Sequence, residues 1–191
     1  MVLPTLLFPH SLMPLYIFEP RYRRMLAGAL DGQRMLCIAL LKPGVEGWSS
    51  VDDFHHVAGL GLVRACVERE DGTSHLILQG LARVAFAGFT QAEPFPIAQI
   101  RELPSQPAEE SETALLVAKL LKVCAKLRQQ GHGVPQGLDE QLAKMNRPEM
   151  LADVVAHTFL SDPYRRQEVL EELRVGARLR LLLRHLAAEM V

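Results

Sequence analysis

The stretch Val57–Phe86, VAGLGLVRACVEREDGTSHLILQGLARVAF, decides the fold of the first half of the chain. It holds two apolar runs of strand-forming residues, separated by the polar segment Glu68–Thr73. Asp71-Gly72 is a turn dipeptide, because glycine adopts positive φ without a Cβ clash. The two runs are therefore predicted to pair as an antiparallel hairpin. Gly80 interrupts the second run and predicts a bulge or the close approach of another backbone segment.

The residues before this stretch predict short strands and one helix. Leu3–Phe8 and Leu15–Phe18 are apolar, and Pro9 and Pro14 predict a loop between them because proline cannot donate to a strand ladder. Pro20 suits the first turn of a helix, where its missing N–H would have no partner. Apolar residues then follow at helical spacing, so one helix is expected over residues 20–32.

Further strands are expected on both sides of the hairpin. Met35–Leu41 is a continuous apolar run and predicts a central strand, whereas Phe89–Arg101 is interrupted by prolines and predicts an edge strand. Residues 42–56, which lie between the Met35–Leu41 run and the hairpin, predict a loop. This loop carries the only tryptophan, Trp48, and the pair His55-His56. Adjacent histidines on an extended segment point to opposite faces, so they make a poor shared metal site. No metal site is expected.

The second half of the chain predicts helices. After Leu103–Pro107 the apolar spacing changes from two to about 3.6 residues. A helix is expected to begin near the acidic residues Glu109 and Glu110 and to end in the glycine-rich segment 129–137. Later helices are expected after Asn146 and Ser161, with a break near Gly176. The sequence therefore predicts an α+β fold, with a β-rich lobe over residues 1–104 and a helical bundle over residues 105–191.

Composition and charge exclude several classes of protein. The chain has 191 residues, 49% hydrophobic residues and a net charge of −1, without the basic excess of a nucleic-acid binder. Cys37, Cys66 and Cys124 lie in separate apolar runs, which indicates buried free thiols in a reducing, cytoplasmic setting. No apolar run is long enough to cross a bilayer, and the N-terminal residues do not predict a secretory signal. We expect no membrane partner and no cofactor.

Four elements in a fixed order carry a family resemblance. They are Met13–Tyr22 (MPLYIFEPRY), Val57–Gly61 (VAGLG), Gly80–Val84 (GLARV) and Leu151–Ala156 (LADVVA). This order resembles the N-terminal substrate-binding domain of Lon protease over nearly the whole chain. The resemblance implies a β-rich lobe of the pseudo-barrel, PUA-like type with one helix, followed by helices.

The sequence lacks the motifs of the catalytic domains of that family. It has no Gly-x-x-x-x-Gly-Lys-Ser/Thr loop, and none of its serines lies in a Ser-x-x-Lys motif or a glycine-flanked elbow. No catalytic residue is therefore expected. The resemblance implies recognition without hydrolysis, which favours a module that binds polypeptide, with unfolded or apolar protein segments as ligands.

Three aromatic residues are the candidate contacts for such a ligand. Trp48 and Phe54 lie in the predicted loop, and Phe95 lies in the interrupted edge strand, where a peptide could add as an extra strand. Peptide binding through exposed side chains requires apolar surface, because apolar burial supplies its driving force. Taken individually, each of these aromatic residues is better explained by simple packing.

Two alternatives stay open. The chain could be an adaptor that docks on a larger ATPase, on a protease or on a second copy of itself through Arg178, Arg180 and Arg184 of the last helix. It could also be a small hydrolase that uses the cleft between the lobes. The hydrolase requires a cluster of polar groups with shifted pKa values, and the sequence shows no such cluster.

Overall fold

The computed structural model describes residues 1–130 and 137–190. It divides into two compact units, Met1–Leu103 and Pro104–Val191, which we call the β unit and the helical unit. Most of the glycine-rich segment that was expected to end the first helix of the second half lies outside the described residues. The α+β class is confirmed, whereas the division at Pro104 into separately folding domains and the PUA-like type of the β unit stay predictions.

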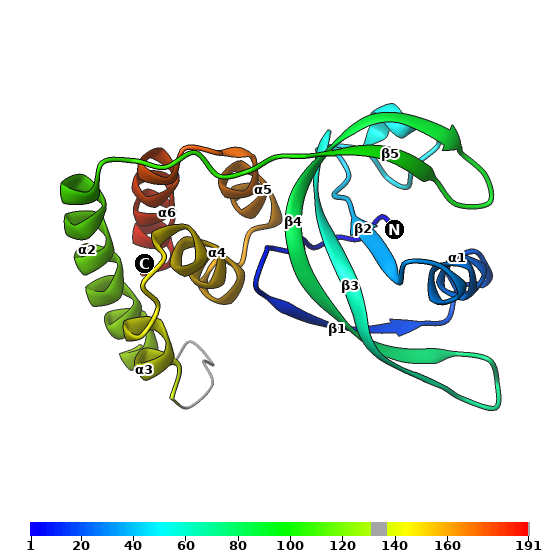
Figure 1. Cartoon of the computed structure of the whole chain (residues 1–191), viewed down its shortest axis with the longest axis horizontal. Coiled ribbons are helices and arrows are strands. Elements are labelled where there is room, and N and C mark those ends of the chain that lie inside the picture. The colour runs from blue at the N-terminus through cyan, green and yellow to red at the C-terminus, as the bar shows by residue number, and fades with distance from the viewer. Residues whose placement is uncertain (131–136, 191) are drawn as a thin grey trace. The chain divides into compact units, whose positions relative to one another are not determined.

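The β unit is a five-stranded antiparallel sheet with one α-helix (Figure 1). Four strands follow the order β1-β4-β3-β2, and β5 also pairs with β4. Both β1 and β5 lie on the edge of β4 opposite β3, one after the other. In chain order the elements are β1 (Leu12–Ile17), α1 (Pro20–Asp31), β2 (Met35–Ile38), the 3-10 turn η1 (Val51–Asp53), β3 (Val57–Glu68), β4 (Ser74–Gln91) and β5 (Ile97–Glu102).

The hairpin of β3 and β4 forms as the sequence predicts. Gly72 has φ of 76°, and the Asp71 carboxylate accepts a hydrogen bond from the Thr73 N–H at 2.9 Å, which stabilises the turn. Strand β4 continues through Gly80, where a Cβ would lie 1.9 Å from the Phe8 carbonyl oxygen. Gly80 therefore marks the close approach of another backbone segment, and the β3–β4 register also shifts between Leu60↔Ala82 and Gly61↔Gly80, so both features that the sequence indicated are present.

Two expectations for the β unit were wrong. Pro14 lies inside β1, opposite Ile77, rather than in a loop, because β1 is an edge strand and a proline there can direct its nitrogen to the free edge. The run expected as a central strand forms the short β2, which lies at the end of the strand order. Its continuation pairs with the N-terminal residues through a parallel bridge between Val2 and Ala39.

The helical unit consists of α2 (Glu110–Gln129), α3 (Leu138–Ala143), α4 (Pro148–Phe159), α5 (Pro163–Glu171) and α6 (Val175–Glu189). Helices α2 and α4 both pack against α6 (Figure 1). The Asp162 carboxylate caps α5 by accepting hydrogen bonds from Tyr164 N at 2.8 Å and Arg165 N at 2.9 Å. The break expected near Gly176 lies at Glu172–Arg174, between α5 and α6, and Gly176 itself is in the first turn of α6. The buried leucines of this unit include Leu120, Leu127, Leu142, Leu151, Leu179, Leu182 and Leu186.

Arg178 is buried at 0% exposure, which is the main correction in this unit. Its Nη1 pairs with the Asp153 carboxylate at 3.2 Å, and its Nε donates to the Glu172 carbonyl at 2.7 Å. Its Nη2 donates to Ser105 Oγ at 3.0 Å and to the Leu173 carbonyl at 3.2 Å. Arg178 is therefore a structural cation of the core and cannot belong to the basic outer face that the sequence suggested.

Candidate functional site

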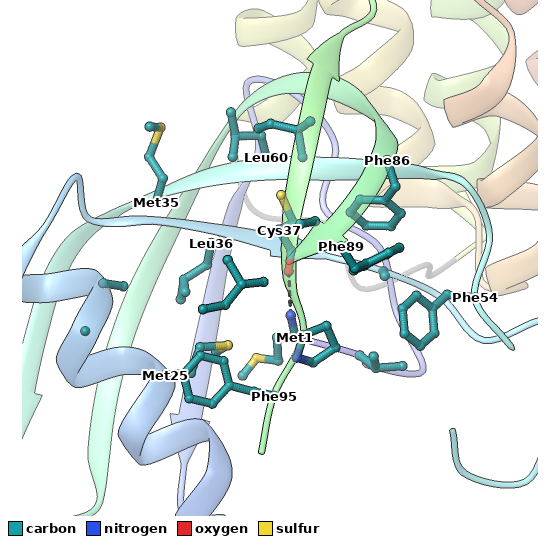
Figure 2. A pocket seen from close by; sticks show the side chains of 18 of the residues that line it. Met1, Met25, Met35, Leu36, Cys37, Phe54, Leu60, Phe86, Phe89 and Phe95 are labelled. Atoms are coloured by element: carbon teal, nitrogen blue, oxygen red, sulfur yellow. Dashed lines mark hydrogen bonds between the residues drawn. The ribbon is translucent and has the colours of Figure 1, made fainter. Parts of the chain in front are cut away.

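The β unit contains an apolar pocket with a volume of about 480 Å³. Residues from α1 and from all strands except β1 contribute to its wall, together with the N-terminal residues and the segment that precedes β5 (Figure 2). The lining residues are Met1, Val2, Met25, Gly28, Ala29, Gln33, Met35, Leu36, Cys37, Ala39, Phe54, Leu60, Phe86, Phe89, Phe95, Pro96, Ile97, Ala98 and Ile100.

The pocket arises because the sheet is not closed. In the described part of the chain β5 pairs only with β4, and β2 lies at the far end of the strand order. Two separate groups of buried residues form on this sheet, one around Met25 and Leu36 and the other around Phe54 and Val84. Residues of both groups line the pocket, so the cavity is the space that the two groups leave unfilled.

Helix α1 contributes one side of the pocket through residues at helical spacing. Met25 is 7% exposed, and Ala29 follows it after one turn. Between them lies Gly28, where an added Cβ would meet no atom within 4 Å. The small residues at 28 and 29 therefore leave room that larger side chains would occupy.

Aromatic rings form the opposite side. The Phe54 ring centroid lies 6.4 Å from that of Phe86 and 6.0 Å from that of Phe89, and the rings meet edge to face. Phe86 and Phe89 are 5.2 Å apart. Figure 2 shows these three rings on one side of the pocket, away from Met25 and Phe95. Such edge-to-face contacts hold the rings in defined positions, so this wall is formed before any ligand binds.

The structure separates the three candidate residues from the sequence. Phe95 is half-buried and lines the pocket, and it also packs against the group that contains Met25. Phe54 lines the pocket as well, but it is only 2% exposed and belongs to the core. Trp48 packs edge to face on Phe54 at 5.7 Å and is not among the lining residues. Whether any of them contacts a ligand stays a prediction.

Sequence reasoning missed most of the wall. The methionines of α1 and β2, the aromatic residues of β4 and the isoleucines of β5 were treated as ordinary strand or helix residues. The helical spacing of Met25 and Ala29 and the short separation of Phe86 and Phe89 were the available signals. Neither signal distinguishes a cavity wall from a filled core, because that distinction depends on which strands fail to pair.

The polar groups of the pocket are few. The amine of Met1 donates a hydrogen bond to the Cys37 carbonyl oxygen at 2.8 Å (Figure 2). Burial lowers the pKa of this amine from 8.0 to about 6, and burial also raises the pKa of the Cys37 thiol. Gln33 contributes the other polar side chain among the described residues of the wall. At neutral pH the wall therefore carries no full charge.

The N-terminal residues are held in this wall by backbone hydrogen bonds. Leu3 N donates to the Ala39 carbonyl at 3.0 Å, and Ala39 N donates to the Met1 carbonyl at 3.0 Å. The buried Tyr22 of α1 also bonds to Val2, since its hydroxyl donates to the Val2 carbonyl at 3.2 Å. Burial is the main cause of the raised pKa of Tyr22. This hydroxyl acts as an anchor for the N-terminal residues.

No group of three or more histidine, cysteine or acidic side chains within residues 1–130 and 137–190 could hold a metal ion. Cys37, Cys66 and Cys124 are free thiols. In the same two ranges, every helix is too short or too polar to cross a membrane.

The fold and the site together define a class, an α+β domain with an uncharged apolar pocket in its β unit. The family model described as the ATP-dependent protease La (LON) substrate-binding domain matches residues 1–188. The chain therefore belongs to the family of Lon substrate-binding domains, and the resemblance seen in the sequence is confirmed. The match is to the substrate-binding domain of that protease.

Whole-chain relatives agree with this assignment. The chain is 25% identical over 181 residues to the Lon protease of Desulfosudis oleivorans, which covers 94% of this chain and 22% of that protein. It is 23% identical over 185 residues to the Lon protease of Escherichia coli (strain K12), covering 97% of this chain and 24% of that protein. The chain thus spans less than a quarter of the length of these relatives.

Solved structures show the same fold. The N-terminal domain of a Mycobacterium avium complex Lon protease superposes with a TM-score of 0.75 at 18% identity, covering 98% of this chain and 96% of that one. A Lon N-terminal domain protein from Xanthomonas campestris superposes with a TM-score of 0.68 at 15% identity, covering 96% and 95%. At these identities the likeness concerns the fold.

Proposed function

We propose that this chain is a non-catalytic, cytoplasmic polypeptide-recognition module whose pocket in the β unit binds apolar segments of unfolded proteins. The observation that carries the proposal is the pocket wall, which is built almost entirely of hydrocarbon, thioether and aromatic groups. Burial of apolar surface is non-directional, so such a wall accepts many sequences. Membership in the substrate-binding family supports a role in recognition.

The composition of the wall suits varied ligands. Met1, Met25 and Met35 all line the pocket. Methionine side chains are unbranched and polarisable, and they adjust to ligands of different shape. The aromatic wall opposite them is held by ring contacts and supplies a fixed surface. One adaptable side and one rigid side together allow a broad but apolar selection.

The proposal can be tested by filling the pocket without disturbing the fold. Gly28→Phe places a ring where an added Cβ meets no atom within 4 Å, and Gly28 lines the pocket. Ala27→Phe is the matched control, since Ala27 is an exposed neighbour on α1 that does not line the pocket. The probe is a second, labelled protein whose cysteines are reduced and carboxymethylated so that it cannot fold. Its binding to the chain and to each variant is measured by fluorescence anisotropy.

We expect the unmodified chain and the Ala27→Phe variant to bind the unfolded probe alike. The Gly28→Phe variant is expected to bind at least about tenfold more weakly, equivalent to about 1.4 kcal/mol. Circular dichroism establishes that both variants are folded. An unmodified chain that leaves the probe unbound at high micromolar concentration, or equal binding by the two variants, contradicts the proposal.

A further inference from the structure

Strand β5 combines a free edge with a place in the pocket wall. In the described part of the chain it pairs with β4 alone, so its other edge has no strand partner. Ile97 and Ile100 are 45% and 40% exposed, although both line the pocket. An unpaired edge with exposed apolar side chains is a template for a further strand.

The hydrogen-bond alternation of β5 shows which backbone groups face the free edge. Leu103, directly after β5, donates its N–H to the Arg83 carbonyl at 2.9 Å and therefore points towards β4. In an antiparallel ladder, the backbone N–H and C=O groups of every second residue point to the same side. Since those of Leu103 point towards β4, the N–H and C=O groups of Ala98 and Ile100 point away from it. Phe86, which lies opposite Ile100 on β4, supports this orientation. Its N–H donates to the His56 carbonyl at 3.0 Å, on the side of β4 away from β5.

Two of the three β5 residues that face the free edge, Ala98 and Ile100, also line the pocket, whereas the third, Glu102, does not. Ala98 and Ile100 are both lining residues, and residues that lie directly opposite each other in a ladder place their side chains on the same face. A strand added to β5 would therefore direct the side chain opposite Ala98 or Ile100 towards the pocket. The free edge of β5 is therefore positioned so that a strand bound to it would have a side chain next to the pocket.

The other exposed edge of the sheet lacks this arrangement. Strand β1 carries Pro14 in its middle, and its other edge is unpaired in the described residues. A proline removes one donor from that edge, which discourages strand addition. Strand β5 has no proline between Ile97 and Glu102, so all its edge-facing donors are present.

The pocket selects the chemistry of the side chain that enters it. A volume of about 480 Å³ lies towards the lower end of the range for ligand pockets, roughly 300–1,000 Å³, which suits one bulky group. The wall offers no carboxylate or guanidinium from its described residues. A charged side chain placed there would lose its hydration without gaining a counter-charge, which is strongly unfavourable.

We propose that an extended polypeptide adds to the free edge of β5 and inserts one bulky, uncharged side chain into the pocket. This inference rests on the proposed function and specifies how the polypeptide is bound. Backbone hydrogen bonds to Ala98 and Ile100 give affinity that is independent of sequence. The pocket adds a requirement for a single anchor residue, such as phenylalanine or leucine.

The anchor is tested with a labelled, uncharged polar host peptide that carries one variable central residue. Phenylalanine and leucine are expected to bind about tenfold or more tightly than alanine or lysine. In the Gly28→Phe variant the phenylalanine peptide is expected to fall to the affinity of the alanine peptide, whereas Ala27→Phe leaves the series unchanged. Equal affinity for phenylalanine and lysine overturns the inference.

Strand addition is tested by N-methylation of the same peptide. In a strand, every second backbone N–H faces the partner strand. Methylation of the anchor nitrogen and methylation of the neighbouring nitrogen therefore remove donors from opposite edges of the peptide. One of the two methylated peptides is expected to lose at least about tenfold in affinity while the other binds like the parent. Equal effects of the two methylations overturn strand addition.

The outcomes separate this inference from the proposed function. If the unfolded protein binds and Gly28→Phe weakens it, but the two methylated peptides behave alike, the proposed function stands and strand addition is wrong. If the unmodified chain binds no unfolded polypeptide at all, both are wrong.

Discussion

In the helical unit the guanidinium of Arg178 is enclosed among acceptors, whereas in the β unit the amine of Met1 is enclosed beside one carbonyl oxygen. Arg178 meets the Asp153 carboxylate, two backbone carbonyls and the Ser105 hydroxyl. Met1 has the Cys37 carbonyl at 2.8 Å, and no described carboxylate forms an ion pair with it. Burial lowers the pKa of the Met1 amine to about 6.

The difference reflects the packing of the two interiors. The helical unit closes its core around leucines and one compensated ion pair, and this arrangement serves stability. The β unit leaves its sheet unclosed and places an uncharged amine in the wall of a cavity, which keeps that cavity suitable for apolar groups.

Removing the counter-charge of Arg178 is expected to have the largest effect. Asp153→Ala leaves a buried guanidinium without its carboxylate, which costs roughly 3–5 kcal/mol of the free energy of unfolding. Arg174→Ala is the control, because Arg174 is exposed where it pairs with Glu172 at 3.2 Å, and such a pair contributes little to stability. Urea denaturation followed by circular dichroism measures both. Similar losses in the two variants would mean that Arg178 is not stabilised as described.

The Met1 amine is expected to make stability depend on pH. Its pKa is about 6 in the folded chain and 8.0 in the reference state, so the unfolded chain holds more protons between these values. The free energy of unfolding therefore rises with pH from 6 to 8, by about 2–3 kcal/mol, and this amine contributes no further change outside that window. The measurement compares urea denaturation across this range for the chain and for its N-terminally acetylated form. If the two forms have parallel pH profiles, the amine is not buried uncharged.

The close approach of two backbone segments in the β unit leaves no space for a side chain at Gly80, so a larger residue there is expected to lower the free energy of unfolding. Gly80→Ala places a Cβ 1.9 Å from the Phe8 carbonyl oxygen, so the backbone must shift, at a cost of about 1–3 kcal/mol or more. Gly88→Ala in the same strand is the control, because its nearest neighbour would be Gln99 Oε1 at 3.6 Å. Chemical denaturation distinguishes them. A neutral Gly80→Ala variant would show that the backbone of Phe8 and Pro9 does not lie against Gly80 as described.

The smallest effect is expected at the pocket itself. Gly28→Ala replaces a glycine within α1 where no atom lies within 4 Å, so it is expected to stabilise the β unit by about 0.5–1 kcal/mol. Gly44→Ala is the counterpart, since its surroundings are equally open but its φ is +78°, and it is expected to destabilise. Thermal unfolding of the two variants should shift in opposite directions. A shift in the same direction would contradict the helical backbone assigned to Gly28.

Local signals in the sequence predicted the elements that depend on local physics. The Asp71-Gly72 turn, the helix that begins at Pro20 and the Asp162 cap of α5 each depend on backbone conformation or on hydrogen bonds within a few residues. The edge position of β5 was also predictable, but the expected strand began too early, because Phe89–Gln91 belong to β4 and β5 begins at Ile97. The same reasoning failed at Pro14, because an edge strand tolerates a proline that usually interrupts a strand.

The candidate site was predictable only in part. Phe95 was found because it lies beside an edge strand, but Phe54 belongs to the core and Trp48 packs behind it. The methionines of the wall carry no local signal for a cavity. Arg178 has the spacing of an exposed cation and is nevertheless buried, because Asp153, distant in the chain, lies opposite it.

The sequence by itself determined the α+β class, the family, the central hairpin and the absence of the motifs of the catalytic domains, because these follow from short patterns of polarity, turn residues and motif spacing. Only the tertiary structure decided where the sheet remains open, which side chains surround the resulting pocket and which cations are buried. These features depend on contacts between residues far apart in the chain, and local patterns do not encode which edges of a sheet remain unpaired.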